Sequence, residues 1–292
     1  MSRCKLGTTI IDALKVCYEV NVEDLSALTE LEYGEWEVIN NFSFFRVASQ
    51  HFAYCYNIIY SECDERQDVA QLRFGRYGER ETNVIFAFLH ISNQVLYDPV
   101  RLGLVLRLPD ELGMVFHNIT MVDLAKDFTI NPVTIIKKLY KDTSTTTIIN
   151  GKAVKDRKMI IDGVSQSYSV SLDRLKNPTL YFKQAKAIHN KVKGIVVTAY
   201  NKMAEIEESG KDYVLEFYGN PKRLNRLEVH LNSQEISDYF KKRGVVQDLS
   251  LIMDEAFRSE MYFYHLSSVI RFSKKREGIP WEDILKCNGR VR

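Results

Sequence analysis

The sequence has no Cys-x-x-Cys pair, no His-x-His pair and no apolar run long enough to cross a membrane. Its five cysteines are odd in number and irregularly spaced, which argues against both a disulfide framework and a cysteine-based zinc site. The first twenty residues lack a long apolar segment followed by a cleavage site, so they do not resemble a secretion signal. We therefore expect a cytoplasmic protein with reduced cysteines.

The chain contains enough apolar residues to bury a sizeable core, since they make up 45% of its 292 residues. The formal net charge of +2 conceals an uneven distribution. Residues 134–202 contain 14 Lys or Arg and only four Asp, a local excess of +10. Such a charge run is often only a solvated surface, but this concentration also suits contact with a nucleic-acid phosphate backbone.

Three runs of alternating apolar and polar residues, 178–183, 194–202 and 225–231, predict half-buried strands. One face of the predicted sheet is apolar, and the other carries Thr179, Tyr181, Lys183, Thr198, Tyr200, Lys202, Arg226, Glu228 and His230. We expect the first two runs to form a hairpin with its midpoint near His189 and Asn190. In that hairpin Tyr181 is expected opposite Tyr200 as a cross-strand pair.

A fourth strand-like run, 119–128, places Asp123 and Asp127 on one face. One interpretation is that these polar faces are an ordinary solvent-exposed side of a sheet, without a functional role. The alternative is metal-assisted phosphoryl transfer, which requires hard oxygen ligands, a nucleophile and a cation. Carboxylates, tyrosines and lysines on neighbouring strands supply all three.

Four segments together resemble the ordered motifs of rolling-circle replication initiators. They are Val-Asp-Leu-Ala-Lys-Asp-Phe (122–128), Leu-Tyr-Phe-Lys (180–183), Ala-Tyr-Asn-Lys-Met-Ala-Glu-Ile-Glu (199–207) and Asn-Arg-Leu-Glu-Val-His-Leu (225–231). Two groups are similar: the plasmid initiators of the Rep_trans family and the filamentous-phage gene II replication proteins. The opening Thr-Thr-Ile-Ile-Asp-Ala-Leu-Lys-Val (8–16) also resembles the start of the phage proteins, so the resemblance spans residues 8–243.

The resemblance implies a metal-dependent endonuclease that nicks DNA at a specific site, transfers the strand and so initiates replication of a plasmid or phage. It implies Mg²⁺ or Mn²⁺ held by Asp123 and Glu228. Asp127 is a weaker candidate ligand, because it could equally terminate its strand. His230 shares a face with Glu228 and is expected to be a metal ligand, a general acid or an ordinary surface histidine. The absence of a His-x-His pair disfavours the nickases that bind metal through paired histidines.

The nucleophile implied by the resemblance is a tyrosine that stays joined to the 5′-phosphate. The plasmid proteins favour Tyr181 and the phage proteins favour Tyr200, and the spacing of 19 residues between them is longer than in the plasmid proteins. We favour Tyr181, because it precedes a basic loop that could hold DNA. Lys202 is expected to assist ionisation of the hydroxyl.

The expected partner is origin DNA, single-stranded or in a hairpin, within the cytoplasm of a bacterial host. Candidate DNA-binding residues are Lys183, Lys186, Lys191, Lys193 and Arg226. A host helicase or polymerase and a second copy of the chain are further expected partners. Two alternatives stay open: a relaxase of a mobilisable element, and a non-catalytic DNA-binding protein that controls copy number.

The predicted fold class is α+β, an antiparallel sheet covered on one side by helices. We expect a catalytic domain over 1–243 and a basic, helical C-terminal segment over 244–292. Predicted strands lie at 8–20, 36–60, 70–77, 84–91, 119–128 and in a hairpin within 146–170 that turns at Asn150–Gly151 or Asp162–Gly163. Predicted helices lie at 24–31, 98–113, 133–141, 233–242, 249–275 and 280–287, while 203–223 is expected to be a charged connection.

Overall fold

The computed structural model describes residues 4–62, 65–76, 84–154, 168–171, 179–183, 186–188 and 191–286. The side chains at 62, 65, 168–171, 183, 186–188 and 191–193 lie outside this description. The fold is mixed α+β with a large antiparallel sheet, as predicted. Two compact units make up the chain: a small unit, Asp12–Val122, and a large unit, Met1–Ile11 with Asp123–Arg292. Strands β1 (Thr9–Asn21) and β7 (Val115–Phe128) contain the boundaries between them.

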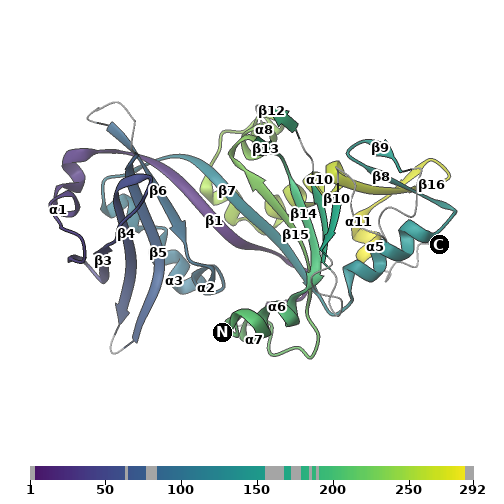
Figure 1. The fold of residues 1–292 in the computed structure, drawn as a ribbon, viewed down its shortest axis with the longest axis horizontal. Coiled ribbons are helices and arrows are strands. Elements are labelled where there is room, and N and C mark those ends of the chain that lie inside the picture. The colour runs from purple at the N-terminus through teal and green to yellow at the C-terminus, as the bar shows by residue number, and fades with distance from the viewer. Residues whose placement is uncertain are drawn as a thin grey trace. The chain divides into compact units, whose positions relative to one another are not determined.

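The small unit contains antiparallel strands in the order β1-β6-β5-β4-β3-β2 (Figure 1). The remaining strands are β2 (Trp36–Ile39), β3 (Phe42–Arg46), β4 (Phe52–Glu62), β5 (Glu65–Arg76) and β6 (Val84–Ile91). Short helices are η1 (Val22–Leu25), α1 (Ser26–Thr29), α2 (Asn93–Leu96), α3 (Pro99–Val105) and α4 (Leu108–Glu111). Phe44, Tyr56 and Phe74 are fully buried, and the Tyr56 hydroxyl donates to the Leu28 carbonyl at 2.6 Å, which fastens α1 to the sheet.

The large unit contains strands in the order β10-β11-β14-β15-β7. Their bounds are Tyr168–Ser171 for β10, Thr179–Lys183 for β11, Val196–Asn201 for β14 and Asn225–Asn232 for β15. Strands β12 (Lys186–Ile188) and β13 (Lys191–Lys193) form a separate pair. Helices are α5 (Pro132–Lys141), α6 (Lys202–Ser209), α7 (Tyr213–Phe217), α8 (Ser233–Arg243), α9 (Leu249–Met253), α10 (Glu255–Val269) and α11 (Trp281–Lys286).

The predicted alternation in β11, β14 and β15 is confirmed. The side chains expected to face the core are at most 1% exposed: Leu180, Phe182, Val197, Ala199, Leu227, Val229 and Leu231. Helix α10 packs against β14 and β15, and the Tyr262 hydroxyl donates to the Leu227 carbonyl at 3.0 Å. One face of this sheet is therefore sealed by a helix, and the opposite face carries Tyr200 and Glu228.

The hairpin register corrects the predicted pairing of the two tyrosines. Tyr181 lies opposite Thr198, and not opposite Tyr200. Lys186 lies opposite Lys193 in the same register, so the midpoint does fall between residues 189 and 190 as predicted. His189 and Asn190 themselves lie outside the described residues. A shift of two residues preserves the face of each side chain, so both tyrosines stay on the polar side.

Two segments differ from their predicted secondary structure. The connection 203–223 contains α6 and α7, and the predicted helix 249–275 is divided into α9 and α10, the second of which ends at Val269. Residues 270–274 instead form β16, whose antiparallel partners are β8 (Thr145–Ile149) and β17 (Glu277–Ile279). Tertiary contacts determine the conformation of this stretch: the buried Trp281 indole donates to the Ile270 carbonyl at 2.9 Å, and β8 and β17 pair with the strand on either side.

The hairpin predicted within 146–170 turns at Asn150–Gly151, between β8 and β9 (Lys152–Ala153). Both turn residues have positive φ, 49° and 78°, which suits a type I′ turn of the Asn-Gly kind. The alternative turn at Asp162–Gly163 lies outside the described residues. No helix in the described part of the chain is long and apolar enough to cross a membrane.

The segment predicted to begin at residue 244 starts where α8 ends. Gly244 has a φ of 69° and closes the helix in the left-handed conformation that glycine adopts without strain. The following residues combine helices with β16 and β17, so they are not helical throughout. They belong to the same compact unit as the sheet that precedes them.

Candidate active site

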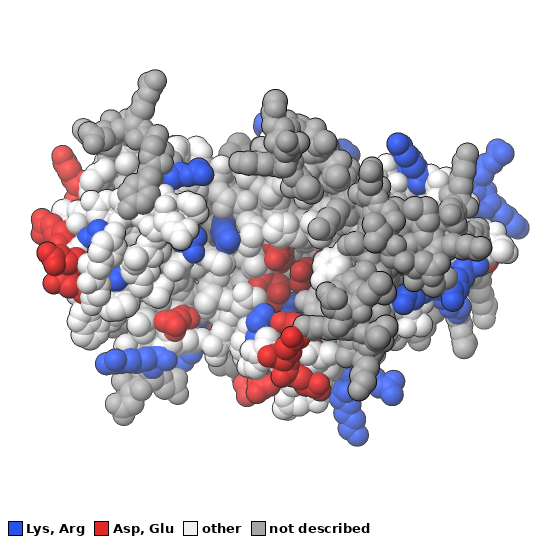
Figure 2. Space-filling view, in the orientation of Figure 1, with Lys and Arg blue, Asp and Glu red and all other residues white. Residues whose placement is uncertain are grey.

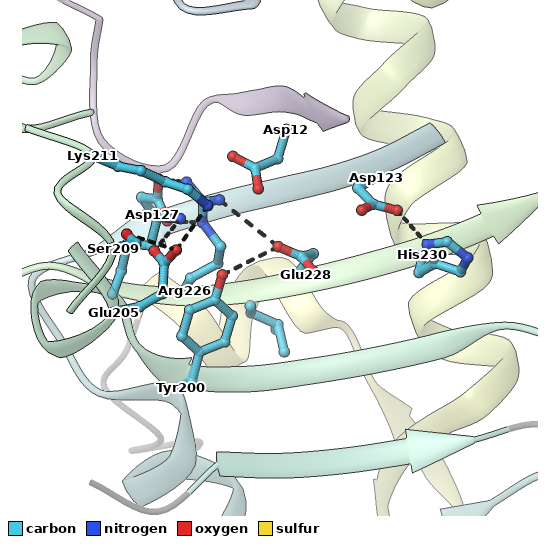
Figure 3. Close-up of polar contacts among 12 residues, drawn as sticks. Asp12, Asp123, Asp127, Tyr200, Glu205, Ser209, Lys211, Arg226, Glu228 and His230 are labelled. Carbon is cyan, nitrogen blue, oxygen red and sulfur yellow. Dashed lines mark hydrogen bonds and ion pairs between the residues drawn. The ribbon is translucent and has the colours of Figure 1, made fainter. Parts of the chain in front are cut away.

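The candidate site lies on the polar face of the large unit's sheet. Strands β7, β14 and β15 each contribute polar side chains to it, and α6 follows directly at the end of β14 (Figure 3). Residues separated by two positions along a strand share a face, which is why Glu228 and His230 point the same way. The site comprises two contacts on that face, each between two side chains, and one ion pair buried beside them.

Asp127 and Arg226 form the buried ion pair. The guanidinium donates from Nε to Oδ1 at 2.7 Å and from Nη2 to Oδ2 at 2.6 Å, and both side chains are 0% exposed. This fork geometry occupies both carboxylate oxygens with charge-assisted hydrogen bonds. Two predictions need correction: Arg226 has no exposed surface to offer DNA, and Asp127 is engaged by a cation and is a poor metal ligand.

Glu228 links this ion pair to a tyrosine. Its Oε2 lies 3.7 Å from Arg226 Nη1 and accepts a hydrogen bond of 3.3 Å from the Tyr200 hydroxyl. Tyr200 sits directly opposite Arg226 in the β14–β15 register, so its ring reaches Glu228 diagonally. Glu228 is 17% exposed and Tyr200 is half-buried, so each side chain reaches solvent in part.

Asp123 and His230 form the second contact on the same face. Asp123 Oδ1 and His230 Nδ1 are 2.5 Å apart, with side chains 19% and 37% exposed. The carboxylate fixes the orientation of the imidazole and favours a proton on Nδ1. Figure 3 draws this pair and Glu228 on the same side of the sheet. Among the residues that the structure describes, no three His, Cys, Asp or Glu side chains gather into a metal-binding group.

Lys202 departs from its predicted role on the exposed face. It is the first residue of α6 and is 1% exposed, and its ammonium lies 2.6 Å from Glu205 Oε2. Burial alone would raise the pKa of Glu205, but the ammonium groups of Lys202 and Lys211 outweigh this effect and lower it. Lys202 therefore neutralises a carboxylate inside the protein. Its Nζ lies 5.9 Å from the Tyr200 ring centroid, within the range of a cation–π contact.

The other predicted nucleophile and the basic loop are less fully described. Tyr181 is half-buried on β11, opposite Thr198. The backbone of the remaining candidate DNA-binding residues lies in β11, β12 and β13, but their side chains are outside the described set: Lys183, Lys186, Lys191 and Lys193.

A cavity of about 550 Å³ opens at the end of β14, directly after Tyr200. Its polar lining includes Asn201, Asn225, Lys222 and Arg223, and both cations are exposed. Sequence reasoning gave Lys222 and Arg223 no role, because 203–223 was expected to be only a charged connection. The available signal was Asn201, whose side chain caps α6 by accepting from the Ala204 amide at 3.3 Å.

No protein-family model matches the chain, and no curated protein matches it. Among solved structures, DynU16, a protein of the dynemicin biosynthetic locus, has 9% sequence identity to this chain. That alignment covers 88% of this chain and 96% of DynU16, with a TM-score of 0.22. A TM-score this low does not indicate a shared fold.

Proposed function

We propose that this chain nicks DNA at a specific site and transfers the strand to a tyrosine, initiating rolling-circle replication of a plasmid or phage. The observation that carries the proposal is the hydrogen bond from the Tyr200 hydroxyl to the Glu228 carboxylate. It joins a nucleophile to a base on an accessible sheet face, which is the arrangement that activates a hydroxyl for attack.

In the proposed reaction the Tyr200 oxygen attacks the phosphorus of a phosphodiester, and Glu228 accepts the hydroxyl proton. A tyrosine–phosphate bond forms, the bond from phosphorus to the 3′-oxygen breaks, and that oxygen takes up a proton to become a 3′-hydroxyl. Free tyrosine has a pKa of about 10, so attack near neutral pH requires such a base. The contact favours Tyr200 over Tyr181 as the nucleophile.

Arg226 is a positioning residue in this scheme. Its guanidinium is fixed by Asp127 from one side and approaches Glu228 from the other, so the carboxylate is held where the Tyr200 hydroxyl reaches it. Lys202 also positions the tyrosine, through the cation–π contact with its ring.

Mg²⁺ or Mn²⁺ remains part of the proposal. Asp123 and Glu228 are partly exposed carboxylates on one face, and Mg²⁺ is commonly held by one or two carboxylates together with substrate phosphate oxygens. The donor set therefore fits an ion bound together with DNA, with Asp123 and Glu228 holding it and His230 orienting Asp123. When bound, the ion would supply positive charge to the phosphate. Asp127 does not fit, because Arg226 occupies both its oxygens.

DNA binding is supported by basic groups around this face. Lys222 and Arg223 line the cavity at the end of β14 and suit contacts to phosphates flanking the reacting one. Figure 2 also shows Lys and Arg gathered where Figure 1 places α5 and β16, and these two elements contain the exposed residues Lys138, Lys141 and Arg271. The lysines of β11 to β13 remain predicted DNA contacts. A host polymerase extending the 3′-hydroxyl and a second copy of the chain remain proposed partners.

The test is incubation with supercoiled DNA that carries the native origin, in Mg²⁺ or Mn²⁺ and in a chelator. We expect a covalent protein–DNA adduct, with mass spectrometry locating the nucleotide on the peptide that contains Tyr200. Tyr200→Phe should abolish the adduct, and Tyr181→Phe, the matched control on the neighbouring strand, should retain it.

Each contrary outcome has a defined meaning. A nucleotide on Tyr181 would transfer the role to that residue and refute the assignment from the Glu228 contact. If the parent protein binds origin DNA but forms no adduct, the proposed nicking activity is refuted. The non-catalytic DNA-binding protein is then the alternative that the result supports.

A further inference from the structure

Helices α8 and α10, together with Ile195 just before β14, enclose a second cavity in the large unit. Its volume is about 150 Å³, and its polar lining includes Glu235, Asp238, Tyr239 and His265, together with Tyr264 and Ser268. It shares no residue with the candidate active site. The helices pack on the sealed side of the sheet, whereas Tyr200 and Glu228 lie on the opposite, polar face.

Three side chains in this cavity are buried without a protein partner for their polar atoms. Tyr239, His265 and Glu235 are 2%, 3% and 7% exposed. The Tyr239 hydroxyl, both His265 ring nitrogens and Glu235 Oε2 have no hydrogen-bond partner among the described protein atoms. Buried polar groups are nearly always paired, and each one left unpaired is costly. Three of them around one cavity point to a ligand that pairs with them.

The protonation states define what such a ligand must offer. Burial lowers the pKa of His265 to about 4, so at neutral pH its imidazole has one acceptor nitrogen and one N–H donor. Burial raises the pKa of Tyr239 to about 12, so its hydroxyl stays protonated. Glu235 and Asp238 add carboxylate acceptors from one face of α8, three positions apart. Acceptors and negative charge predominate, which calls for a cationic hydrogen-bond donor.

Aromatic rings line the same cavity and favour a planar cation. The ring centroids of Tyr239, Tyr264 and His265 lie 5.0 to 5.4 Å from one another. Tyr264 already accepts one cation, because Lys242 Nζ lies 4.4 Å from its ring centroid and 3.2 Å from its hydroxyl oxygen. Aromatic faces attract cations, and planar guanidinium groups also stack on them.

We propose that this cavity binds a guanidinium or amidinium group, with Glu235 Oε2 and the Tyr239 hydroxyl accepting its N–H donors. A guanidinium presents several N–H donors in a fixed plane, which matches carboxylate acceptors. A cavity of about 150 Å³ accommodates a group the size of a benzene ring. The group could belong to a small molecule such as agmatine or to an arginine side chain of a peptide, and the test separates these sources.

The test uses the full chain and isothermal titration with guanidinium at low millimolar concentration. Urea, its neutral analogue of the same shape, is the ligand control. We expect saturable binding of guanidinium and none of urea. Agmatine and a short arginine-containing peptide are then compared: tighter binding of agmatine identifies a small-molecule site, and tighter binding of the peptide identifies a protein partner.

Variants assign the binding to this cavity. Glu235→Gln should weaken guanidinium binding about tenfold or more, because it removes a charged acceptor. Glu216→Gln on α7 is the matched control, since Glu216 is an exposed carboxylate outside the cavity, and it should bind as the parent does. Tyr239→Phe should weaken binding while leaving the urea midpoint unchanged or raised, because the hydroxyl it removes has no protein partner.

Tyr239→Phe tests the binding site even if the Glu235→Gln protein does not fold. Equal responses to urea and guanidinium, or parent-like binding by Tyr239→Phe, would overturn the proposal. The outcome is independent of DNA nicking, because no residue of this cavity takes part in that proposal.

Discussion

Replacing Asp127 by Asn tests whether the buried ion pair holds the candidate site together. The substitution keeps the shape of the side chain but removes the charge that faces Arg226. Arg226 then remains 0% exposed with its counter-charge gone, and Glu228, 3.7 Å from Nη1, is the acidic group that stays beside it. A buried charge that loses its partner is strongly destabilising, because burial prevents water from replacing that partner.

The expected loss of unfolding free energy is about 3 kcal/mol, the lower end of the range for breaking a buried pair, since Glu228 offsets part of it. The assay is urea unfolding followed by fluorescence of Trp281, which is 2% exposed and lies in the large unit. A Trp36→Phe background removes the other tryptophan, which is 57% exposed and lies in the small unit. The midpoint should fall by about 1 M.

Glu260→Gln supplies the matched control. Its pair with Arg243 has a similar distance, 2.7 Å, but the two side chains are 50% and 46% exposed. Solvent screens such a pair, so breaking it should cost less than about 1 kcal/mol. If Asp127→Asn lowers the free energy of unfolding no more than Glu260→Gln does, burial does not determine the strength of the Asp127–Arg226 pair.

Three further outcomes are expected. Glu228→Gln should slow adduct formation about a hundredfold with unchanged DNA affinity, measured by single-turnover nicking; a rate equal to the parent's would exclude it as the base. Lys222→Gln and Arg223→Gln together should lower the log–log salt slope of DNA binding by roughly 0.7–0.9 for each phosphate that is no longer neutralised, and an unchanged slope would remove them from the DNA surface. Burial lowers the pKa of His265 from 6.5 to about 4, so as pH falls from 6.5 towards 4 the unfolded chain takes up a proton that the folded chain does not. Stability should fall in that window by about 1.4 kcal/mol per pH unit from this group, and urea unfolding of His265→Phe should show a shallower dependence; equal slopes in both proteins would contradict the shift.

The sequence alone determined which residues share a sheet face. Alternation of apolar and polar residues is a local property, because successive side chains of a strand point to opposite sides. Leu180, Val197 and Leu227 were therefore assignable to the core before any tertiary contact was known. The Asn150–Gly151 turn was likewise among the predicted alternatives, since the conformation it requires depends on its own two residues.

Tertiary structure decided which polar residues on that face are accessible. Arg226 and Glu228 lie on the same face of their strand. The counter-charge of Arg226 is Asp127, 99 residues away in sequence, and both members of this ion pair are buried. Lys202 is buried because β14 ends and α6 begins at that residue, which turns its side chain inward to Glu205. The position of a residue in the alternation fixes only the side of the sheet to which its side chain points. Burial depends on what the rest of the chain packs there, and a charge can be buried only where a distant residue supplies its partner.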